Sequence, residues 1–163
     1  MNSNILVVYK KNFEGVHDIA LKQMIECLEK LNTELGITIN YKAREQVQKQ
    51  DFVERDLIIV LGGDGTLTSI SHNILDNTPV MGVNSNPRTT DPQGSVGFYL
   101  DSDMVTFSED ARNALNKNCI FNSMPRLQAT ITTTSGNIMK SDPALNDLLV
   151  ANTQQYMPSK YNL

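Results

Sequence analysis

The sequence predicts an α/β fold: a doubly wound, mostly parallel sheet over about residues 1–118, followed by the start of an antiparallel β domain. Two observations predict the first part. Strand-like apolar runs alternate with segments of helical periodicity, and these runs are apolar almost throughout, as in parallel strands covered on both faces. The third observation is a strictly alternating, β-branched stretch after about residue 120, which is typical of an antiparallel strand.

Four elements are expected in the first third of the chain. Residues 4–9 contain a continuous apolar run and predict a buried strand. Apolar side chains recur at helical spacing over residues 16–35, and Gly36 is a natural helix stop. Residues 37–41 alternate between apolar and polar, as a half-exposed strand does, and the polar residues 44–53 indicate a short helix.

The next group of elements completes the sheet. Residues 56–61 predict a fully apolar strand and residues 79–84 another, with a helix-compatible segment, residues 67–75, between them. Residues 86–95 are rich in Pro, Gly and polar side chains and predict an exposed loop. The spacing of apolar residues over 103–117 predicts a further helix.

The last part of the chain has a different pattern. Residues 126–132 predict a strand, residues 135–137 a turn, and residues 145–150 a further strand. We therefore expect an α/β domain over residues 1–118 and the incomplete beginning of a β-rich second domain over residues 119–163.

The charge balance narrows the classes of partner. The 14 Lys and Arg against 18 Asp and Glu give a formal charge of −4, which argues against a nucleic-acid surface and a polybasic membrane anchor. No apolar run approaches the roughly 18 residues that span a membrane, and the N-terminus lacks the cationic start of a signal peptide. Cys27 and Cys119 fit no metal spacing, so we expect reduced, mostly buried thiols in a cytoplasmic protein.

Residues 61–66, Leu-Gly-Gly-Asp-Gly-Thr, carry the strongest functional signal. Glycines between a buried strand and a helix let successive backbone N–H groups turn toward an anion, and the positive end of the helix adds to the same spot. Among phosphates, Asp64 would hold a metal ion or take a proton from an attacking hydroxyl. The weaker alternative is a plain turn in which Thr66 caps the helix.

A second loop is expected beside this one. In such sheets ligands bind at the carboxyl ends of the strands, and residues 62–66 and 84–85 both follow strand ends. The lysine of the Walker pattern and the spacing of the dinucleotide pattern are both absent. A metal ion or basic residues from elsewhere must therefore screen the phosphates.

Four motifs stand in the order and spacing of one known family. They are residues 61–66, 80–84 (Val-Met-Gly-Val-Asn), 97–98 (Gly-Phe) and 144–147 (Ala-Leu-Asn-Asp). Together they resemble the NAD kinase family, and the Asn-Ser-Asn-Pro-Arg loop at 84–88 is closest to its mitochondrial-type branch. The broader diacylglycerol-kinase-like superfamily shares only the first motif. Family members usually continue into a further β-rich half, so the chain resembles a truncated member.

The resemblance implies a reaction and a role for each matching residue. A phosphoryl group passes from ATP, the co-substrate, to the 2′-hydroxyl of the adenosine ribose of NAD, giving NADP, with Mg²⁺ or a similar divalent ion. Asp64 matches the carboxylate that accepts the hydroxyl proton. Asn146 and Asp147, in place of the commoner Asn-Glu pair, match the residues that hold NAD through its ribose hydroxyls. The other nucleotide-binding residues that it implies are Gly62, Gly63, Gly65, Thr66, Asn84 and Phe98, the last near the adenine.

Two other functions stay open from the residues alone. One is a truncated, non-catalytic nucleotide-binding module of the same family, and the other is a lipid or sphingoid kinase that shares only the glycine loop. ATP or polyphosphate as donor, NAD or NADH as acceptor, and assembly into a homo-oligomer are open too. Outside the motifs, we expect His17 to be solvated, His72 to be structural or exposed, and Asp91 to serve a turn.

Overall fold

The chain forms two compact units, Met1–Ser123 and Met124–Leu163. This computed structural model describes residues 3–11, 15–152, 154 and 156–160. The first unit holds a five-stranded sheet and the second a two-stranded one. No helix within the described residues is long and apolar enough to cross a membrane.

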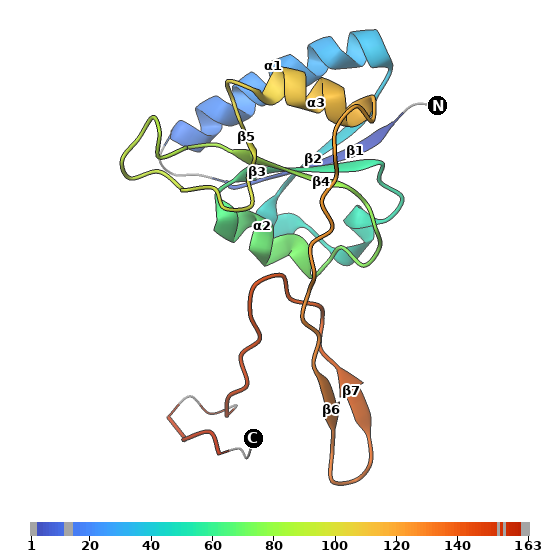
Figure 1. Ribbon diagram of the computed structural model, residues 1–163, viewed down its shortest axis with the longest axis vertical. Coiled ribbons are helices and arrows are strands. Elements are labelled where there is room, and N and C mark those ends of the chain that lie inside the picture. The colour runs from blue at the N-terminus through green and yellow to red at the C-terminus, as the bar shows by residue number, and fades with distance from the viewer. Residues whose placement is uncertain (1–2, 12–14, 153, 155, 161–163) are drawn as a thin grey trace. The chain divides into compact units, whose positions relative to one another are not determined.

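The first unit is a parallel sheet with helices on both faces (Figure 1). The strand order is β2-β1-β3-β4-β5, and all four pairings are parallel. The predicted doubly wound α/β sheet is therefore confirmed. Its elements are β1 (Asn4–Tyr9), α1 (Val16–Leu35), β2 (Thr38–Ala43), the 3₁₀ turns η1 (Arg44–Gln46) and η2 (Lys49–Phe52), β3 (Leu57–Gly62), α2 (Asp64–Ser71), β4 (Val80–Asn84), β5 (Ser102–Asp103) and α3 (Phe107–Leu115).

The chain reverses its direction across the sheet between β1 and β3. From β1 it moves outward to β2 and then returns to the other side of β1, where β3, β4 and β5 follow in order. In doubly wound sheets, ligands bind outside the carboxyl ends of the strands that flank such a reversal. The topology therefore indicates a ligand site at the carboxyl ends of β1 and β3, at Tyr9 and Gly62.

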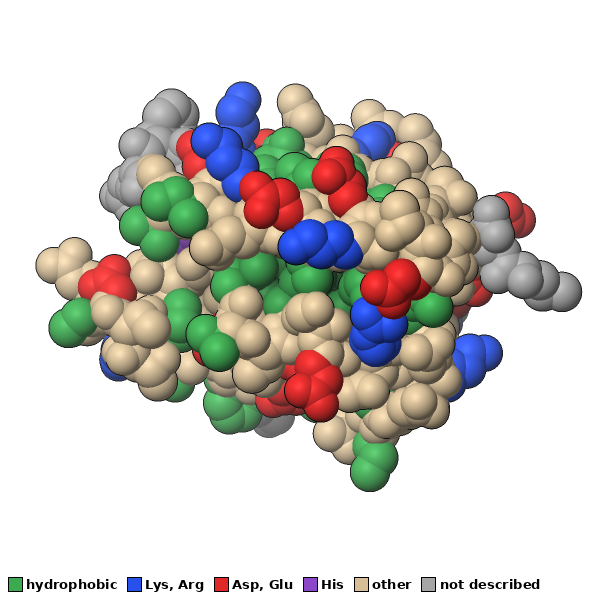
Figure 2. Space-filling model, turned by 90° about the horizontal axis from the view of Figure 1, so that it is seen from above, with side chains coloured by type: hydrophobic (Ala, Val, Ile, Leu, Met, Phe, Trp, Pro, Cys, Tyr) green, Lys and Arg blue, Asp and Glu red, His purple; other side chains and the backbone are tan. Residues whose placement is uncertain are grey.

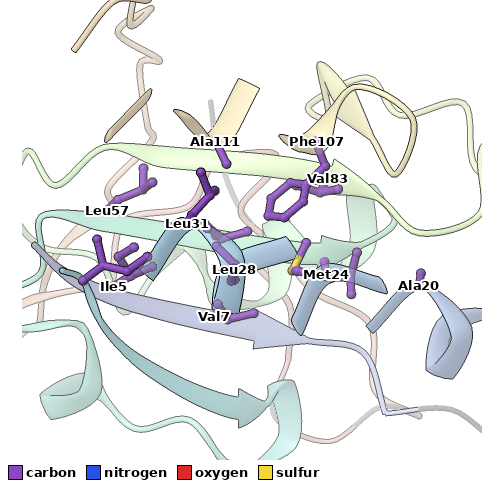
Figure 3. Packing of buried hydrophobic residues seen from close by; sticks show 13 residues of the cluster. Ile5, Val7, Ala20, Met24, Leu28, Leu31, Leu57, Val83, Phe107 and Ala111 are labelled. Atoms are coloured by element: carbon purple, nitrogen blue, oxygen red, sulfur yellow. The ribbon is translucent and has the colours of Figure 1, made fainter. Parts of the chain in front are cut away.

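The main core lies between the sheet and the helices α1 and α3. One face of α1 supplies Ala20, Met24 and Leu28, each at most 3% exposed and spaced by one helical turn. Figure 3 shows these side chains with Phe107 of α3 and Val83 of β4, which are both fully buried. This packing holds α1 and α3 on the same face of the sheet.

The helix α2 covers the opposite face of the sheet (Figure 1). Because side chains alternate along a strand, the residues between those of the main core, such as Leu6 and Val8 of β1 and Val60 of β3, point to this side. All three are fully buried. Burial on both faces explains why β1 and β3 are continuous apolar runs in the sequence.

The predicted bounds hold for α1 and shift for α2. α1 ends before Gly36, whose φ of 62° is left-handed and whose N–H donates to the Asn32 carbonyl at 2.9 Å. α2 begins at Asp64 rather than at Leu67, so the carboxylate belongs to the helix itself. The short helix expected over 44–53 is instead the two 3₁₀ turns η1 and η2.

Arg55 ties the start of β1 and the middle of β2 to the segment that leads into β3. Its Nη1 donates to the Asn4 Oδ1 and the Asn40 Oδ1, each at 2.6 Å, and its Nε donates to a carbonyl of η2 at 2.8 Å. We expect Arg55→Ala to lower the free energy of unfolding by about 1–2 kcal/mol, because these oxygens lose their donor. Urea unfolding measures it, with Arg44→Ala as control, since Arg44 pairs with its exposed neighbour Glu45. Equal losses in the two variants would contradict the prediction.

The second unit contains an antiparallel hairpin of β6 (Thr130–Thr132) and β7 (Ile138–Lys140). The turn is closed by the Thr133 N–H, which donates to the Asn137 carbonyl at 2.9 Å. Gly136 takes a φ of 84° in this turn, which glycine adopts without strain. The start of an antiparallel β region, expected from the sequence, is confirmed.

The further strand predicted over residues 145–150 is wrong. These residues are described and adopt no regular structure. The pairing that precedes them ends at Ala144, whose N–H and carbonyl each bond to Leu127 at 2.8 Å. Beyond it no described residue supplies a neighbouring strand, and Leu149 is 89% exposed. An apolar run forms a strand only where another strand accepts and donates its hydrogen bonds.

The face formed by α1 and α3 carries charges of both signs. Figure 2, seen from this side, shows acidic and basic side chains interspersed rather than gathered by sign. One pair, Arg112 Nη1 and Glu34 Oε2, lies 2.6 Å apart and joins α3 to α1, and this hydrogen bond lowers the pKa of Glu34. Cys27 packs half-buried against the core, whereas Cys119 is exposed, which corrects the expectation that both thiols are mostly buried.

Candidate functional site

A glycine-rich loop joins β3 to α2 at the carboxyl edge of the sheet. β3 is buried as far as its last residue, Gly62, and α2 begins at Asp64 with Gly63 as its N-cap residue. Among the described residues, no side chain caps the first turn of α2, and Thr66, the alternative cap, lies inside the helix. The N–H groups at this helix start are the kind that bind anions, with the positive end of the helix dipole behind them.

Gly62 and Gly65 are glycines for different reasons. A Cβ at Gly62 would lie 2.3 Å from the Thr66 Oγ1 and 2.7 Å from the Thr66 Cβ, so glycine makes room for this buried side chain. At Gly65 no described atom lies within 4 Å of the position that a Cβ would take, and its φ is not left-handed. Neither packing nor backbone conformation requires glycine there, and the open space leaves the backbone accessible to a ligand.

The end of β4 lies beside this loop. Asn84 is the register partner of Gly62, and the Ser85 N–H donates to the Gly62 carbonyl at 3.1 Å. The Asn84 side chain is 4% exposed. Its Nδ2 donates to the Ser95 carbonyl at 3.2 Å, and its Oδ1 accepts the Asn86 N–H at 3.1 Å. Asn84 therefore fixes both ends of the loop that follows β4.

Residues 86–95 form a loop that is closed by its own hydrogen bonds. The Ser95 N–H donates to the Asn86 carbonyl at 2.9 Å. The Asp91 carboxylate accepts the Asn86 Nδ2 at 2.7 Å and the Gln93 N–H at 2.9 Å. These two bonds hold the pKa of Asp91 below its usual range. Asp91 serves the turn, as predicted.

The Asp64 carboxylate contacts the segment after this loop. Its Oδ2 accepts the Phe98 N–H at 3.0 Å, and its Oδ1 accepts the Tyr99 N–H at 2.8 Å. The Phe98 side chain is 77% exposed, and its ring stands edge-on to the Tyr99 ring with 4.9 Å between centroids. The first unit therefore brings together the glycine loop, Asp64, Asn84 and Phe98.

His17 departs from the expectation that it is solvated. It is half-buried, and its Nδ1 lies 2.6 Å from the Ser85 Oγ. This bond joins the start of α1 to the end of β4 at the rim of the site, so His17 is a structural link. His72 follows the last residue of α2, at the opposite end from the glycine loop, which agrees with a structural role.

Lys10 is a candidate that the sequence motifs did not show. It follows β1, and its N–H donates to the Leu61 carbonyl at 3.0 Å, so it lies beside the end of β3 at the reversal of the sheet. Ile5 and Val7 face the main core, so the alternation along β1, continued, places Lys10 on the face that α2 covers. In the sequence, the available signal was a lysine directly after a predicted strand. That signal indicates a site residue only once the strand order is known.

Asn146 and Asp147 belong to the second unit. They follow Ala144, which pairs with Leu127, and both side chains are exposed. The Asn146 Nδ2 donates to the Asp147 Oδ2 at 3.2 Å, so an amide and a carboxylate stand together in one exposed segment. They form a second group of candidate residues within their own unit.

The site does not resemble a cage for a resident metal ion. In the described parts of the chain, no cluster of three or more His, Cys, Asp or Glu side chains occurs. At the glycine loop, both oxygens of Asp64 already accept backbone N–H groups. Mg²⁺ keeps several waters and is commonly held by one or two carboxylates together with substrate phosphates. These residues fit an ion that arrives with phosphates.

The fold and these groups define a class of protein: a doubly wound α/β domain with a glycine-rich loop and a carboxylate at its ligand-binding edge. Residues 1–118 match the family described as the ATP-NAD kinase N-terminal domain, and the chain belongs to this NAD kinase family. The resemblance that the four motifs predicted is thereby confirmed.

Individual relatives agree with this family. The NAD kinase of Clostridium tetani is 27% identical over 144 residues, which are 88% of this chain and 48% of that protein. The probable NADH kinase of Oryza sativa subsp. japonica is 32% identical over 102 residues, 59% of this chain and 31% of that protein. An NAD kinase from Archaeoglobus fulgidus, crystallised in complex with ATP, shares the fold with a TM-score of 0.55 at 21% identity, over 82% of this chain and 44% of that one. The chain thus spans about half, or less, of the length of these relatives.

Proposed function

We propose that this protein is an NAD kinase, which transfers a phosphoryl group from ATP to the 2′-hydroxyl of the adenosine ribose of NAD and so makes NADP. One observation carries the proposal. In a chain of the NAD kinase family, the Asp64 carboxylate stands at the uncapped start of α2, where the next residue, Gly65, leaves open space for a ligand. The names of the relatives support the same substrates.

The roles follow from the chemistry of phosphoryl transfer, which requires alignment, neutralised charge and an oriented hydroxyl. The N–H groups of Gly63 and Gly65 receive phosphate oxygens at the helix start. The ribose 2′-oxygen forms a bond to the γ-phosphorus, the bond from that phosphorus to ADP breaks, and the hydroxyl proton passes to Asp64. We assign the adenine contact to the exposed Phe98 ring, because the Phe98 N–H donates to the Asp64 carboxylate. A divalent ion bound with the ATP phosphates would offset part of their charge.

The second group of residues has the chemistry to hold a ribose. The Asp147 carboxylate accepts the O–H groups of a vicinal diol, one on each oxygen, and the Asn146 amide both donates and accepts. Their exposure leaves these atoms accessible to a ligand. We assign them to the ribose hydroxyls of NAD.

Incubation of the chain with NAD, ATP and Mg²⁺, followed by chromatographic detection of NADP and ADP, tests the proposal. We expect NADP and ADP in equal amounts. Parallel reactions with NADH in place of NAD, and with polyphosphate in place of ATP, identify the acceptor and the donor. Binding of NAD in calorimetry without NADP formation would indicate a nucleotide-binding module. If the chain neither binds NAD nor forms NADP, the proposal is wrong.

Lys10 is expected to supply the positive charge that the glycine loop lacks. Lys10→Gln should weaken ATP binding about tenfold or more, since a charge-assisted contact to a phosphate oxygen is lost. The matched control is Lys11→Gln, the next residue, which is exposed and follows on the other face by the same alternation. Titration calorimetry at low salt measures both. Equal losses for the two lysines would indicate general attraction rather than a contact at Lys10.

A further inference from the structure

The Asp64 carboxylate is bound to a distant part of the chain by two hydrogen bonds. The Phe98 and Tyr99 N–H groups, 34 and 35 residues away in sequence, donate one to each oxygen. Hydrogen bonds from N–H groups to a carboxylate are shorter and stronger than those between neutral groups. The side chain proposed as the base therefore also anchors the segment that carries the exposed aromatic ring.

The segment at residues 97–99 has little else to hold it at its outer side. Gly97 takes a left-handed φ of 76° and reverses the chain, and its carbonyl accepts the Leu100 N–H at 3.2 Å. Leu100 is buried, but Phe98 is 77% exposed and Val96 is 69% exposed. The Phe98 ring contacts the Tyr99 ring edge-on. Side-chain packing alone leaves the direction of Phe98 loosely defined.

We propose that Asp64 is a positioning residue for the turn at 97–99, which it fixes so that the Phe98 ring is presented next to the glycine loop. The pairing requires an acceptor on both sides of the side chain. A carboxylate has an acceptor oxygen on each side. An amide has a single oxygen and would turn its NH₂ group toward the second N–H. The positioning role is compatible with the role of base, because each carboxylate oxygen keeps a second lone pair.

This inference rests on the proposed function only for the use to which Phe98 is put. The hydrogen bonds themselves are a property of the chain without nucleotide. A test without substrate therefore separates the two ideas. If no NADP forms, the positioning role of Asp64 is not contradicted. If the positioning role is contradicted, the proposed reaction is not.

Amide hydrogen exchange followed by NMR on the chain tests the inference. In the wild type, the Phe98 and Tyr99 amides should exchange more slowly than in an unstructured peptide, with amide protons shifted downfield by the carboxylate. Asp64→Asn should speed exchange at these amides about tenfold to hundredfold. The ring-to-ring contacts of Phe98 and Tyr99 should weaken, while exchange at Ile58 and Val60 in the core of β3 stays as in the wild type.

Asp91→Asn is the matched control. Asp91 is a carboxylate of the neighbouring loop that accepts the Gln93 N–H in the same manner. This variant should speed exchange at Gln93 and leave Phe98 and Tyr99 unchanged. Unprotected Phe98 and Tyr99 amides in the wild type would overturn the inference whether or not Asp64→Asn folds, and so would unchanged protection in a folded Asp64→Asn.

Discussion

Asp64→Asn is expected to lower the rate of NADP formation by about 10²–10⁴-fold, the usual contribution of a positioned general base. The amide keeps the shape of the carboxylate but cannot take the proton of the ribose 2′-hydroxyl. It also removes an acceptor from the pair that holds the Phe98 and Tyr99 N–H groups. We therefore expect the dissociation constant for ATP or NAD to rise as well, by about tenfold.

Initial rates and titration calorimetry on the same preparations separate these two effects. Asp91→Asn serves as the control, because it changes a half-buried carboxylate of the neighbouring loop, which accepts hydrogen bonds from Asn86 and Gln93. It should leave the rate close to that of the wild type. Equal NADP formation by wild type and Asp64→Asn would rule out the proposed base. A lower rate of NADP formation with unchanged affinity for ATP and NAD would support Asp64 as the base. It would contradict an effect of the turn at 97–99 on nucleotide binding.

The parallel sheet is predictable from the sequence because a strand that is buried on both faces is a continuous apolar run. β1 was expected at residues 4–9 and α1 at 16–35, and both have these bounds. The apolar spacing predicts too late a start for α2, because aspartate and glycine have low helix propensity and Asp64 and Gly65 resemble loop residues in the sequence. In the fold, packing of the apolar face of α2 on the sheet overrides that propensity.

Other features of the site cannot be predicted from a single sequence, because they are contacts between residues that lie far apart along the chain. The link from Asp64 to Phe98 and Tyr99 uses backbone N–H groups, which nearly every residue has, across a long separation. The link from His17 to Ser85 likewise depends on strand order, which brings the start of α1 to the end of β4. Lys10 gains its interest from the same order. Motifs identified the chemistry of single loops, and the topology decides which loops meet.

Gly62→Ala and Gly65→Ala are expected to act in opposite directions, although each adds one methyl group to the same loop. At Gly62 the methyl group would overlap the Thr66 side chain, which is β-branched, stiff at χ1 and only 2% exposed. We expect a loss of about 1–3 kcal/mol in the free energy of unfolding. At Gly65 the methyl group meets open space inside a helix, and alanine there should raise stability by about 0.5–1 kcal/mol.

The gain in stability at Gly65 should come with a loss of ATP binding. A methyl group at this position keeps a phosphate oxygen away from the backbone N–H, and the lost charge-assisted hydrogen bond corresponds to about a tenfold to hundredfold weaker affinity. Urea unfolding and ATP titration of the two variants measure the pair of effects. A Gly65→Ala variant that is more stable and binds ATP as the wild type does would show that the open space at Gly65 is not the place of a phosphate. A variant that is more stable and does not bind ATP separates the glycine that the fold requires from the glycine that the ligand requires.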